Sequence, residues 1–290
     1  MVVQLRAPPG HGDIYPSLVG SGMLERLLDQ GIEYVFVSNS DNLGATLDLD
    51  ILSHFAKTDG AFLMEVCKRT KGDKKGGHLA KRKSDGRLIL RESAMCPEDD
   101  KSAFEDITIH KYFNTNNLWL NLKKLKFTLE SSGGTLKLPL IKNQKTVNPR
   151  DPTSASVFQL ETAMGSAIEC FDSASAIEVP RTRFAPVKTS SDLFALRSDA
   201  YTISDASTIV LVAAKPPFVK LDDKYYKLVD KMESYTRSSP SLIECTSLLV
   251  RGPVIFESGV TLRGDVVLIN NKDVAVELHS RAIEDIELEL

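Results

Sequence analysis

One short stretch of the chain limits the fold more than any other. Residues 33–38, with the sequence EYVFVS, form a continuous apolar run of strand length, and the polar segment 39–44 follows at once. An apolar periodic segment comes next, at residues 47–55. A buried strand, a polar loop and then a helix is the order typical of α/β proteins. Just upstream, the pattern predicts an amphipathic helix over Leu18–Leu28 that Gly31 stops.

Composition and charge exclude several classes of protein. Of the 290 residues, 42% are hydrophobic, and 36 basic side chains are balanced by 39 acidic ones. This balance argues against a disordered chain and against a generally basic nucleic-acid-binding protein. The longest apolar stretches, such as Ile209–Ala214, are far shorter than the ~20 residues that span a bilayer, and the N-terminus lacks a signal-peptide pattern. We therefore expect a cytoplasmic protein with no membrane and no nucleic-acid partner.

Several further elements are expected along the chain. Strands over 61–66 and 88–90 flank the basic, Gly-rich stretch 68–87, which predicts an exposed hairpin. Further helices are predicted over Trp119–Leu129, Gln159–Phe171, Ser191–Tyr201 and Asp222–Tyr235. Residues 236–240 have the composition of a linker.

After this linker the pattern changes to a six-residue repeat. Apolar residues recur every six positions in two series, Val254, Val260 and Val266, and Phe256, Leu262, Leu268 and Val274. Such hexads are typical of a short parallel β-helix, in which each turn stacks its apolar residues on the previous turn. The alternative is an antiparallel hairpin stack. In either case the unit is interpreted as a packing or assembly module.

Two segments near the start of the chain are candidates for ligand binding. In residues 8–13, PPGHGD, the glycines allow close approach to a bound group, and His11 is a donor for a phosphate or a sugar hydroxyl. The alternative is a structural Pro-Gly turn. In residues 39–42, after the predicted strand, Asp41 has the chemistry to hold Mg²⁺ and Asn39 to bind a sugar. The alternative there is an Asx turn that caps the next helix.

A third candidate is Lys188, in an extended segment just before Ser and Asp residues of helix-capping type. A lysine there can reach phosphates as a point charge, although most lysines are solvated surface residues. The four cysteines are widely scattered, which predicts reduced thiols, and no Ser/His/Asp elbow, HExxH or CxxC pattern is present. The residues alone therefore predict an α/β protein that binds a sugar or a phosphate.

Six segments taken together carry a resemblance to a known family. They are PPGHGDIY at 8–15, FVSNSDNLGA at 36–45, KGG at 75–77, FNTNNLW at 113–119, QLETAMG at 159–165 and VPRTRFAPVKTSSDL at 179–193. In this order they resemble the UTP–glucose-1-phosphate uridylyltransferase (UDP-glucose pyrophosphorylase) family. The resemblance implies a Rossmann-like, GT-A-like mixed sheet with flanking helices and a small C-terminal left-handed parallel β-helix. It also implies that residues 1–236 are the C-terminal portion of the nucleotidyltransferase domain and 237–290 the β-helix domain.

The resemblance also implies a reaction and a set of site residues. The family forms UDP-glucose and pyrophosphate from UTP and glucose 1-phosphate. By resemblance, Lys188 is the catalytic lysine on the UTP phosphates, Asp41 binds the Mg²⁺ that organises them, and Gly10 contacts the nucleotide. The expected substrate-binding residues are His11, Asn39, Ser40, Asp41, Gly77, Glu92 and Asn116. The β-helix is the expected contact surface for a homo-oligomer.

The main departure from the family pattern is an absence. The family opens its catalytic domain with a strand and a Gly-Gly-x-Gly-Thr-Arg loop around the UTP phosphates, followed by a second lysine, and neither is found in the sequence. We expect little or no turnover from the chain as given, because each lost backbone donor is worth about 1.5–3 kcal/mol as a charge-assisted bond. Arg91, where the family has an apolar residue, and His78, where it has a small polar one, are smaller departures.

Two other functions remain open from the sequence. One is a non-catalytic sugar-nucleotide-binding or assembly protein derived from the family. The other is a pyrophosphorylase that acts on a different sugar 1-phosphate. Release of pyrophosphate and binding of UDP-glucose distinguish these alternatives.

Overall fold

The computed structural model describes residues 8–70, 73–74, 76–148, 151 and 153–290, so Lys75 of the KGG motif lies outside the described residues. The chain divides into two compact units. Unit 1 contains the described residues up to Asn39 and Leu47–Phe184, and unit 2 contains Ser40–Thr46 and Ala185–Leu290. Among the described residues, no helix has the length and apolarity needed to cross a membrane. The predicted boundary between residues 236 and 237 falls inside unit 2 and stays a prediction.

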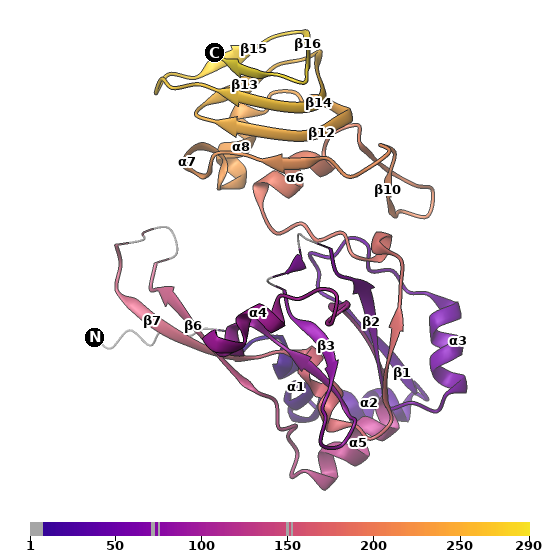
Figure 1. The fold of residues 1–290 in the computed structure, drawn as a ribbon. Coiled ribbons are helices and arrows are strands. Elements are labelled where there is room, and N and C mark those ends of the chain that lie inside the picture. The colour runs from indigo at the N-terminus through magenta and orange to yellow at the C-terminus, as the bar shows by residue number, and fades with distance from the viewer. Residues whose placement is uncertain (1–7, 71–72, 75, 149–150, 152) are drawn as a thin grey trace. The chain divides into compact units, whose positions relative to one another are not determined.

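Unit 1 is built on a six-stranded mixed sheet (Figure 1). Its strands are β1 Tyr34–Val37, β2 Phe62–Lys68, β3 His78–Lys81, β4 Leu88–Arg91, β5 Tyr112–Asn121 and β8 Ala174–Glu178. The path runs β4-β3-β5-β2-β8, and β1 also pairs with β5. Only β2 and β8 pair in parallel within this sheet. The structure confirms the expected strands at 33–38, 61–66 and 88–90. It also confirms a hairpin here, formed by β3, from the basic stretch, and β4.

Strand β5 was not expected from the sequence. The predicted helix over Trp119–Leu129 begins three residues later, because β5 continues to Asn121 and α5 spans Leu122–Ser131. The side chain of Asn121 caps α5 by accepting a hydrogen bond from the Lys124 N–H. Three of residues 113–117, FNTNN, are asparagines, which are weak strand formers, so the pairing of the two ends of β5 with β1 and β2 imposes the strand.

The predicted helix over Gln159–Phe171 is wrong. Strand β7 covers Ser156–Thr162 and pairs with β6, Leu140–Thr146, in an antiparallel ribbon. A 3-10 helix, η5, then spans Met164–Cys170. The apolar residues of this region have helical spacing, but cross-strand pairing in the ribbon outweighs that local signal.

Helices cover both faces of the sheet of unit 1. The predicted helix over Leu18–Leu28 is two helices, α1 Ile14–Gly20 and α2 Met23–Asp29, with a turn at Ser21 and Gly22. These helices and α5 contribute to one apolar cluster. Helix α3, Leu49–Lys57, contributes Ile51 and Phe55 to a separate cluster on the other face. The remaining short elements of unit 1 are η1 His11–Asp13, η3 Ser93–Met95, η4 Glu98–Asp100, α4 Lys101–Phe104 and η6 Arg181–Arg183.

Unit 2 combines short helices with a stack of parallel strands. Its elements before the stack are α6 Ser190–Leu196, β9 Tyr201–Ile203, β10 Ile209–Leu211, β11 Phe218–Lys220, α7 Asp223–Tyr226 and α8 Val229–Tyr235. The helix predicted over Ser191–Tyr201 corresponds to α6, which ends five residues earlier than expected, at Leu196. The carboxylate of Asp199 instead accepts hydrogen bonds from the backbone N–H groups of Leu242 and Ile243. The predicted helix over Asp222–Tyr235 is two short helices.

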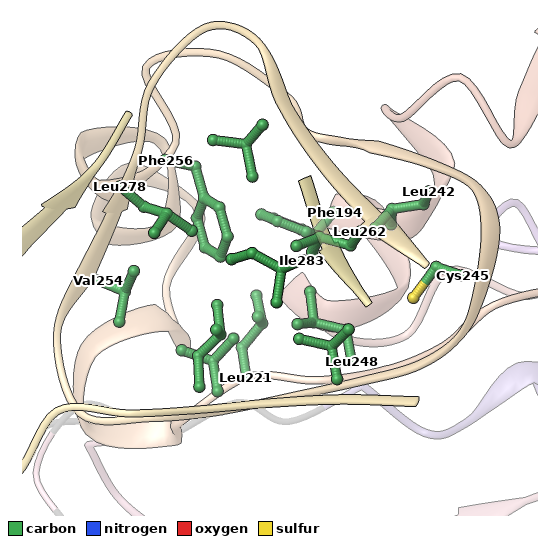
Figure 2. Packing of buried hydrophobic residues seen from close by; sticks show 14 of the residues in the cluster. Phe194, Leu221, Leu242, Cys245, Leu248, Val254, Phe256, Leu262, Leu278 and Ile283 are labelled. Atoms are coloured by element: carbon green, nitrogen blue, oxygen red, sulfur yellow. The ribbon is translucent and has the colours of Figure 1, made fainter. Parts of the chain in front are cut away.

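The hexad region forms the stack. Its strands are β12 Ser241–Arg251, β13 Val254–Phe256, β14 Val260–Ile269, β15 Val276–Leu278, β16 Arg281–Glu284 and β17 Glu287–Glu289. Every pairing among them is parallel, which contradicts the alternative of antiparallel hairpins. The hexad residues are buried and point into one interior with Phe194 and Leu221 (Figure 2). Val274 is the exception at 76% exposure, because the chain leaves the stack in a bend held by the Asn270 side chain.

Candidate functional site

Two of the candidate residues come together in unit 2. The Val187 N–H donates to the Asp41 carbonyl oxygen at 2.9 Å, and the Leu43 N–H donates to the Ala185 carbonyl oxygen at 3.1 Å. Between them, the side chain of Asn42 accepts a hydrogen bond from the Ala185 N–H at 2.9 Å. The loop that carries Asp41 is therefore bonded directly to the segment that leads into Lys188.

The backbone at Lys188 is fixed by the helix that follows it. One oxygen of the Asp192 carboxylate accepts hydrogen bonds from the N–H groups of Lys188 and Thr189, at 3.0 and 2.7 Å. Thr189 and Asp192 form a capping box at the start of α6. The Lys188 side chain is exposed, and its ammonium forms no ion pair with any carboxylate of the described residues. Lys188 is therefore a positioned cation that is available to an anionic ligand.

Asp41 provides one carboxylate of the kind that Mg²⁺ prefers. Its side chain is half-buried, and no group of three or more His, Cys, Asp or Glu side chains that suits a metal occurs among the described residues. The Asn42 side-chain oxygen accepts a hydrogen bond from the Gly44 N–H in an Asx turn and a second one from the Ala185 N–H. This turn does not cap the next helix, because Asp48 caps α3. The donor set fits an ion that takes one carboxylate from this chain and completes its shell with phosphate oxygens and water.

In unit 1, Gly10 and His11 pack against the end of β7. Gly10 has a φ of 87°, and a Cβ placed on it lies 2.6 Å from the Thr162 carbonyl oxygen. Only glycine fits this close approach without strain. The Thr162 N–H donates to the Pro9 carbonyl oxygen, which ties the PPGHGD segment to the QLETAMG segment.

The His11 ring has a defined orientation. Its Nδ1 accepts a hydrogen bond from the Met164 N–H at 2.9 Å, so in the neutral ring the proton resides on Nε2. Partial burial lowers the pKa of His11, while the negative charge of Glu161 opposes this shift. His11 is therefore a neutral side chain near pH 7 whose Nε2–H is a hydrogen-bond donor.

Asn116 has an unusual backbone conformation. Its φ is 60°, in the left-handed region that non-glycine residues seldom adopt. Its side-chain oxygen accepts a hydrogen bond from the Asn114 amide at 2.7 Å, and its N–H donates to the Asn114 side chain at 2.8 Å. Gly165 packs against this Asn114 amide so closely that a Cβ does not fit between them. Asn114, which holds Asn116, and His11 therefore contact neighbouring residues, Gly165 and Met164.

Gly77 and Glu92 also lie together. A Cβ placed on Gly77 lies 2.6 Å from Oε2 of Glu92, so the glycine makes room for the carboxylate. Leu90, two residues before Glu92, touches the same Gly165 position that contacts Asn114. Of the predicted residues, Gly10 and His11 thus contact the end of the QLETAMG segment directly, and Asn116 and Glu92 are linked to it through Asn114 and through the strand that carries Leu90. Asn39 is the last residue of its part of unit 1, and Ser40 belongs with Asp41 to unit 2.

Sequence reasoning missed a buried polar network behind Asn116. Glu65, on β2, is completely buried and accepts hydrogen bonds from Asn117, Trp119 and Arg183. Asn117 and Trp119 alternate along β5, and this period of two is the signal that indicates a shared strand face. The signal was lost because residues 113–117 were not recognised as part of a strand.

Proteins of a known family resemble this chain over most of its length. The sequence profile of the family described as UTP–glucose-1-phosphate uridylyltransferase matches residues 4–263. The chain belongs to the UTP–glucose-1-phosphate uridylyltransferase family. The enzyme of that name from Hordeum vulgare is 43% identical over 279 residues, which are 95% of this chain and 57% of the barley protein. The Saccharomyces cerevisiae enzyme is 41% identical over 278 residues, which are 95% of this chain and 54% of the yeast protein.

Solved structures of this uridylyltransferase family share the fold. The UDP-glucose phosphorylase from Trypanosoma brucei has a TM-score of 0.89 and 49% identity, over 98% of this chain and 62% of that one. A variant of the Leishmania major UDP-glucose pyrophosphorylase, in complex with UDP-glucose, has a TM-score of 0.86 and 47% identity, over 98% of this chain and 63% of that one. The chain therefore spans somewhat more than half the length of its uridylyltransferase relatives.

The structure accommodates both small departures from the uridylyltransferase pattern. Arg91 forms an ion pair with Asp100 and lies over the Phe104 ring at 5.4 Å. His78 is fully buried and stacks on His110 with ring centroids 3.9 Å apart. Neither side chain displaces Glu92 from Gly77.

Proposed function

We propose that this chain carries the sugar-phosphate and metal-binding parts of a uridylyltransferase site that forms UDP-glucose and pyrophosphate from UTP and glucose 1-phosphate. The observation that carries the proposal is the bonding of the Asp41 loop to the Lys188 segment in a member of this family. The Asp41 carboxylate, which suits Mg²⁺, and the exposed Lys188 cation, which pairs with no carboxylate of the described residues, lie on these hydrogen-bonded segments. A metal ion on the carboxylate and the lysine ammonium can together neutralise the negative charge of a triphosphate.

The reaction joins two anions, so its barrier is largely electrostatic. The phosphate of glucose 1-phosphate attacks the α-phosphorus of UTP in line, and pyrophosphate leaves. Lys188 stabilises the charge that develops on the phosphate oxygens, because the Asp192 cap fixes its backbone before the substrate arrives. Mg²⁺ bound through Asp41 supplies neutralisation of the phosphate charges and a fixed orientation.

The cluster in unit 1 fits the sugar side of the substrate. His11 presents an Nε2–H donor, Glu92 a carboxylate that accepts from sugar hydroxyls, and Asn116 a backbone turned out of the strand. Gly10 and Gly77 allow their segments to pack closely against Thr162 and Glu92, because a Cβ at either position clashes with that neighbour. We assign Gly10 to the nucleotide, and His11, Asn39, Ser40, Asp41, Gly77, Glu92 and Asn116 to the sugar and its phosphate.

We propose a finer description of the fold to go with this function. Residues 1–236 are the C-terminal portion of a GT-A-like nucleotidyltransferase domain, and 237–290 are a left-handed β-helix. The parallel pairing of β12, β14 and β16 and the buried hexads support the β-helix. Its last turn, with β15 to β17, is the surface that we assign to contacts in a homo-oligomer.

The first experiment measures turnover and binding together. The purified chain is mixed with UTP, Mg²⁺ and glucose 1-phosphate, and released pyrophosphate is assayed; UDP-glucose binding is measured by calorimetry. Slow release together with UDP-glucose binding supports the proposal, slow because the sequence contains no Gly-Gly-x-Gly-Thr-Arg loop. Binding without release supports the non-catalytic alternative, and absence of both overturns the proposal.

A second experiment tests the role of Lys188. In a preparation that releases pyrophosphate, Lys188→Ala should lower the rate of release by about 10²–10³, the usual effect of removing one group that stabilises transition-state charge. Lys215→Ala, which removes another exposed lysine of unit 2, is the matched control and should leave the rate unchanged. Equal rates for Lys188→Ala and the unsubstituted chain would show that Lys188 is not catalytic.

A further inference from the structure

The carboxylate of Glu65 is the centre of a buried polar network in unit 1. Glu65 has 0% exposure, and Trp119 donates to Oε1 at 2.9 Å while the Asn117 amide donates to Oε2 at 3.0 Å. The hydroxyl of Thr115 donates to the backbone oxygen of Glu65 at 2.8 Å. Glu65 therefore holds three alternate residues of β5, and Asn116 is the residue between two of them.

The strand pairing is irregular at this point. Met64 pairs with Leu118 and Val66 with Asn114, so one residue of β2 lies opposite three residues of β5. The extra length forms a bulge in β5, and Asn116, with its φ of 60°, lies in the middle of it. A left-handed asparagine is about 1–2 kcal/mol less stable than the ordinary conformation, so the surrounding contacts must hold it.

Arg183 completes the hydrogen bonding of Glu65 and balances its charge. Nε and Nη2 of Arg183 each donate to one carboxylate oxygen at 2.7 Å, in the two-pronged geometry that arginine makes with carboxylates. The Arg183 carbonyl oxygen also accepts from the Asn117 amide at 3.3 Å. The bulge is therefore fixed on the Glu65 side by Asn117 and on the opposite side by the bonds between Asn114 and Asn116.

We propose that Glu65 is a positioning residue that acts through Asn117 to hold Asn116 in the conformation that receives the sugar. This inference rests on the function proposed above, which assigns Asn116 to the sugar and its phosphate. Glu65 itself is buried among β5 and Arg183 and acts only through them. Its effect should therefore appear in recognition of the glucose part of UDP-glucose and not of the UDP part.

The test uses Asn117→Ala, which removes the link between Glu65 and the bulge while the pair of Glu65 and Arg183 remains. The matched control is Tyr112→Phe, which removes another bond from β5 to a carboxylate, the one from Tyr112 to Glu178 at 2.9 Å. In the free chain, Asn117→Ala should shift the NMR resonances of the Asn116 backbone amide and the Asn114 side-chain amide. Tyr112→Phe should leave both resonances in place.

Ligand binding provides the second measurement. Asn117→Ala should weaken UDP-glucose binding about tenfold, which corresponds to the loss of one well-placed hydrogen bond. UDP binding should not change, whereas a general loss of structure lowers both affinities together. If Asn117→Ala does not fold, Asn117→Leu, which removes the same amide donor to the Glu65 carboxylate and fills more of its volume, takes its place.

Each result has a separate meaning. Asn116 resonances that stay unshifted in a folded variant overturn the positioning role, and so does an equal loss of UDP and UDP-glucose affinity. Shifted resonances in a chain that binds no UDP-glucose support the action of Glu65 on Asn116 and overturn the proposed function instead. Shifted resonances with a selective loss of UDP-glucose affinity support both.

Discussion

The two units bury different kinds of side chain. Unit 1 buries the charged or titratable groups Glu65, Arg69, His78 and Arg183, each with less than a tenth of its surface exposed. In unit 2, the buried polar side chains of the described residues are Asn42, Ser190, Ser198 and Asn270, none of which is charged. Its charged side chains lie outside, as in the run of Glu244, Arg263 and Glu284 across three neighbouring strands.

This difference shows what each interior is suited to do. Apolar packing is non-directional, so the repeated turns of unit 2 fill space without fixing any one group. A buried carboxylate is tolerated only when hydrogen bonds satisfy it, and those bonds fix its partners in direction as well as distance. The buried hydrogen bonds of unit 1 therefore fix the direction of particular side chains, whereas the apolar interior of unit 2 fixes none.

The largest expected effect on stability comes from the buried charge of unit 1. Glu65→Gln removes the two-pronged carboxylate partner of the buried Arg183 guanidinium and leaves the Asp48 carboxylate, 3.7 Å from Nη1, as a more distant counter-charge. This loss of a buried ion pair should lower the free energy of unfolding by about 3–5 kcal/mol. Denaturant unfolding of the variant and the unsubstituted chain measures this. Glu244→Gln, at an exposed carboxylate of unit 2, is the control and should cost less than about 1 kcal/mol. Similar losses of stability for both variants would mean that the buried charge of unit 1 contributes no more to stability than an exposed charge of unit 2.

The next effect comes from the apolar interior of unit 2. Leu262→Ala should lower the free energy of unfolding by about 3 kcal/mol, because Leu262 is fully buried in the stack and its loss leaves a cavity. Val274→Ala, at the exposed hexad position, should change it by less than about 0.5 kcal/mol. A large loss for Val274→Ala would mean that this residue packs into the stack.

A pH dependence should come from His78. Burial first, and then the nearby charges of His110, Arg69 and Arg91, lower the pKa of His78 from 6.5 to about 4. The unfolded chain therefore binds the proton first as the pH falls, so stability is fully present above pH 6.5 and decreases towards pH 4. The loss across this window should be about 2–3 kcal/mol.

The variant His78→Phe isolates this contribution. It keeps a ring against Phe104 and His110 but does not titrate. Unfolding at pH 7 and pH 4.5 should show a smaller loss of stability in this variant than in the unsubstituted chain. Equal losses would assign the pH dependence to other groups.

The smallest effect is expected at the surface of unit 2. Arg263→Gln removes the ion pair with Glu244 and should cost about 0.2–1 kcal/mol, decreasing as salt is added. Unfolding at 0.05 and 1 M NaCl measures the difference. A cost above about 2 kcal/mol that salt does not reduce would mean that this unit also depends on its charges.

The sequence predicted elements that local signals specify. The run at 33–38 is a strand and the segment beginning at Asp48 is a capped helix, because apolar pattern and capping act within a few residues. Strand β5 and strand β7 were missed, because distant pairing partners decide both. The hexads were interpreted correctly as parallel stacking, since each turn repeats the same local pattern.

For the candidate site, too, the sequence indicated what local patterns specify and missed what distant contacts decide. His11, Asn39, Asp41 and Lys188 were candidates from their local patterns alone, whereas Gly77, Glu92 and Asn116 became candidates only because six short segments matched a family in order. Glu65 was not identified, because a carboxylate inside an apolar run gives no local sign of the partners that neutralise it. Those partners, Asn117 and Arg183, are 52 and 118 residues away in the sequence.

The membership of residues 40–46 in unit 2 has a consequence for synthesis of the chain. Asn42 accepts one of its hydrogen bonds from Ala185, 143 residues later, so the bonds that join the Asp41 loop to residues 185–187 form only after most of unit 1 has left the ribosome. At about 5–20 residues per second, that interval lasts several seconds or more. Unit 1 thus has time to fold around β1 and α3 before residues 185–187, which bind the loop between these two elements, are synthesised.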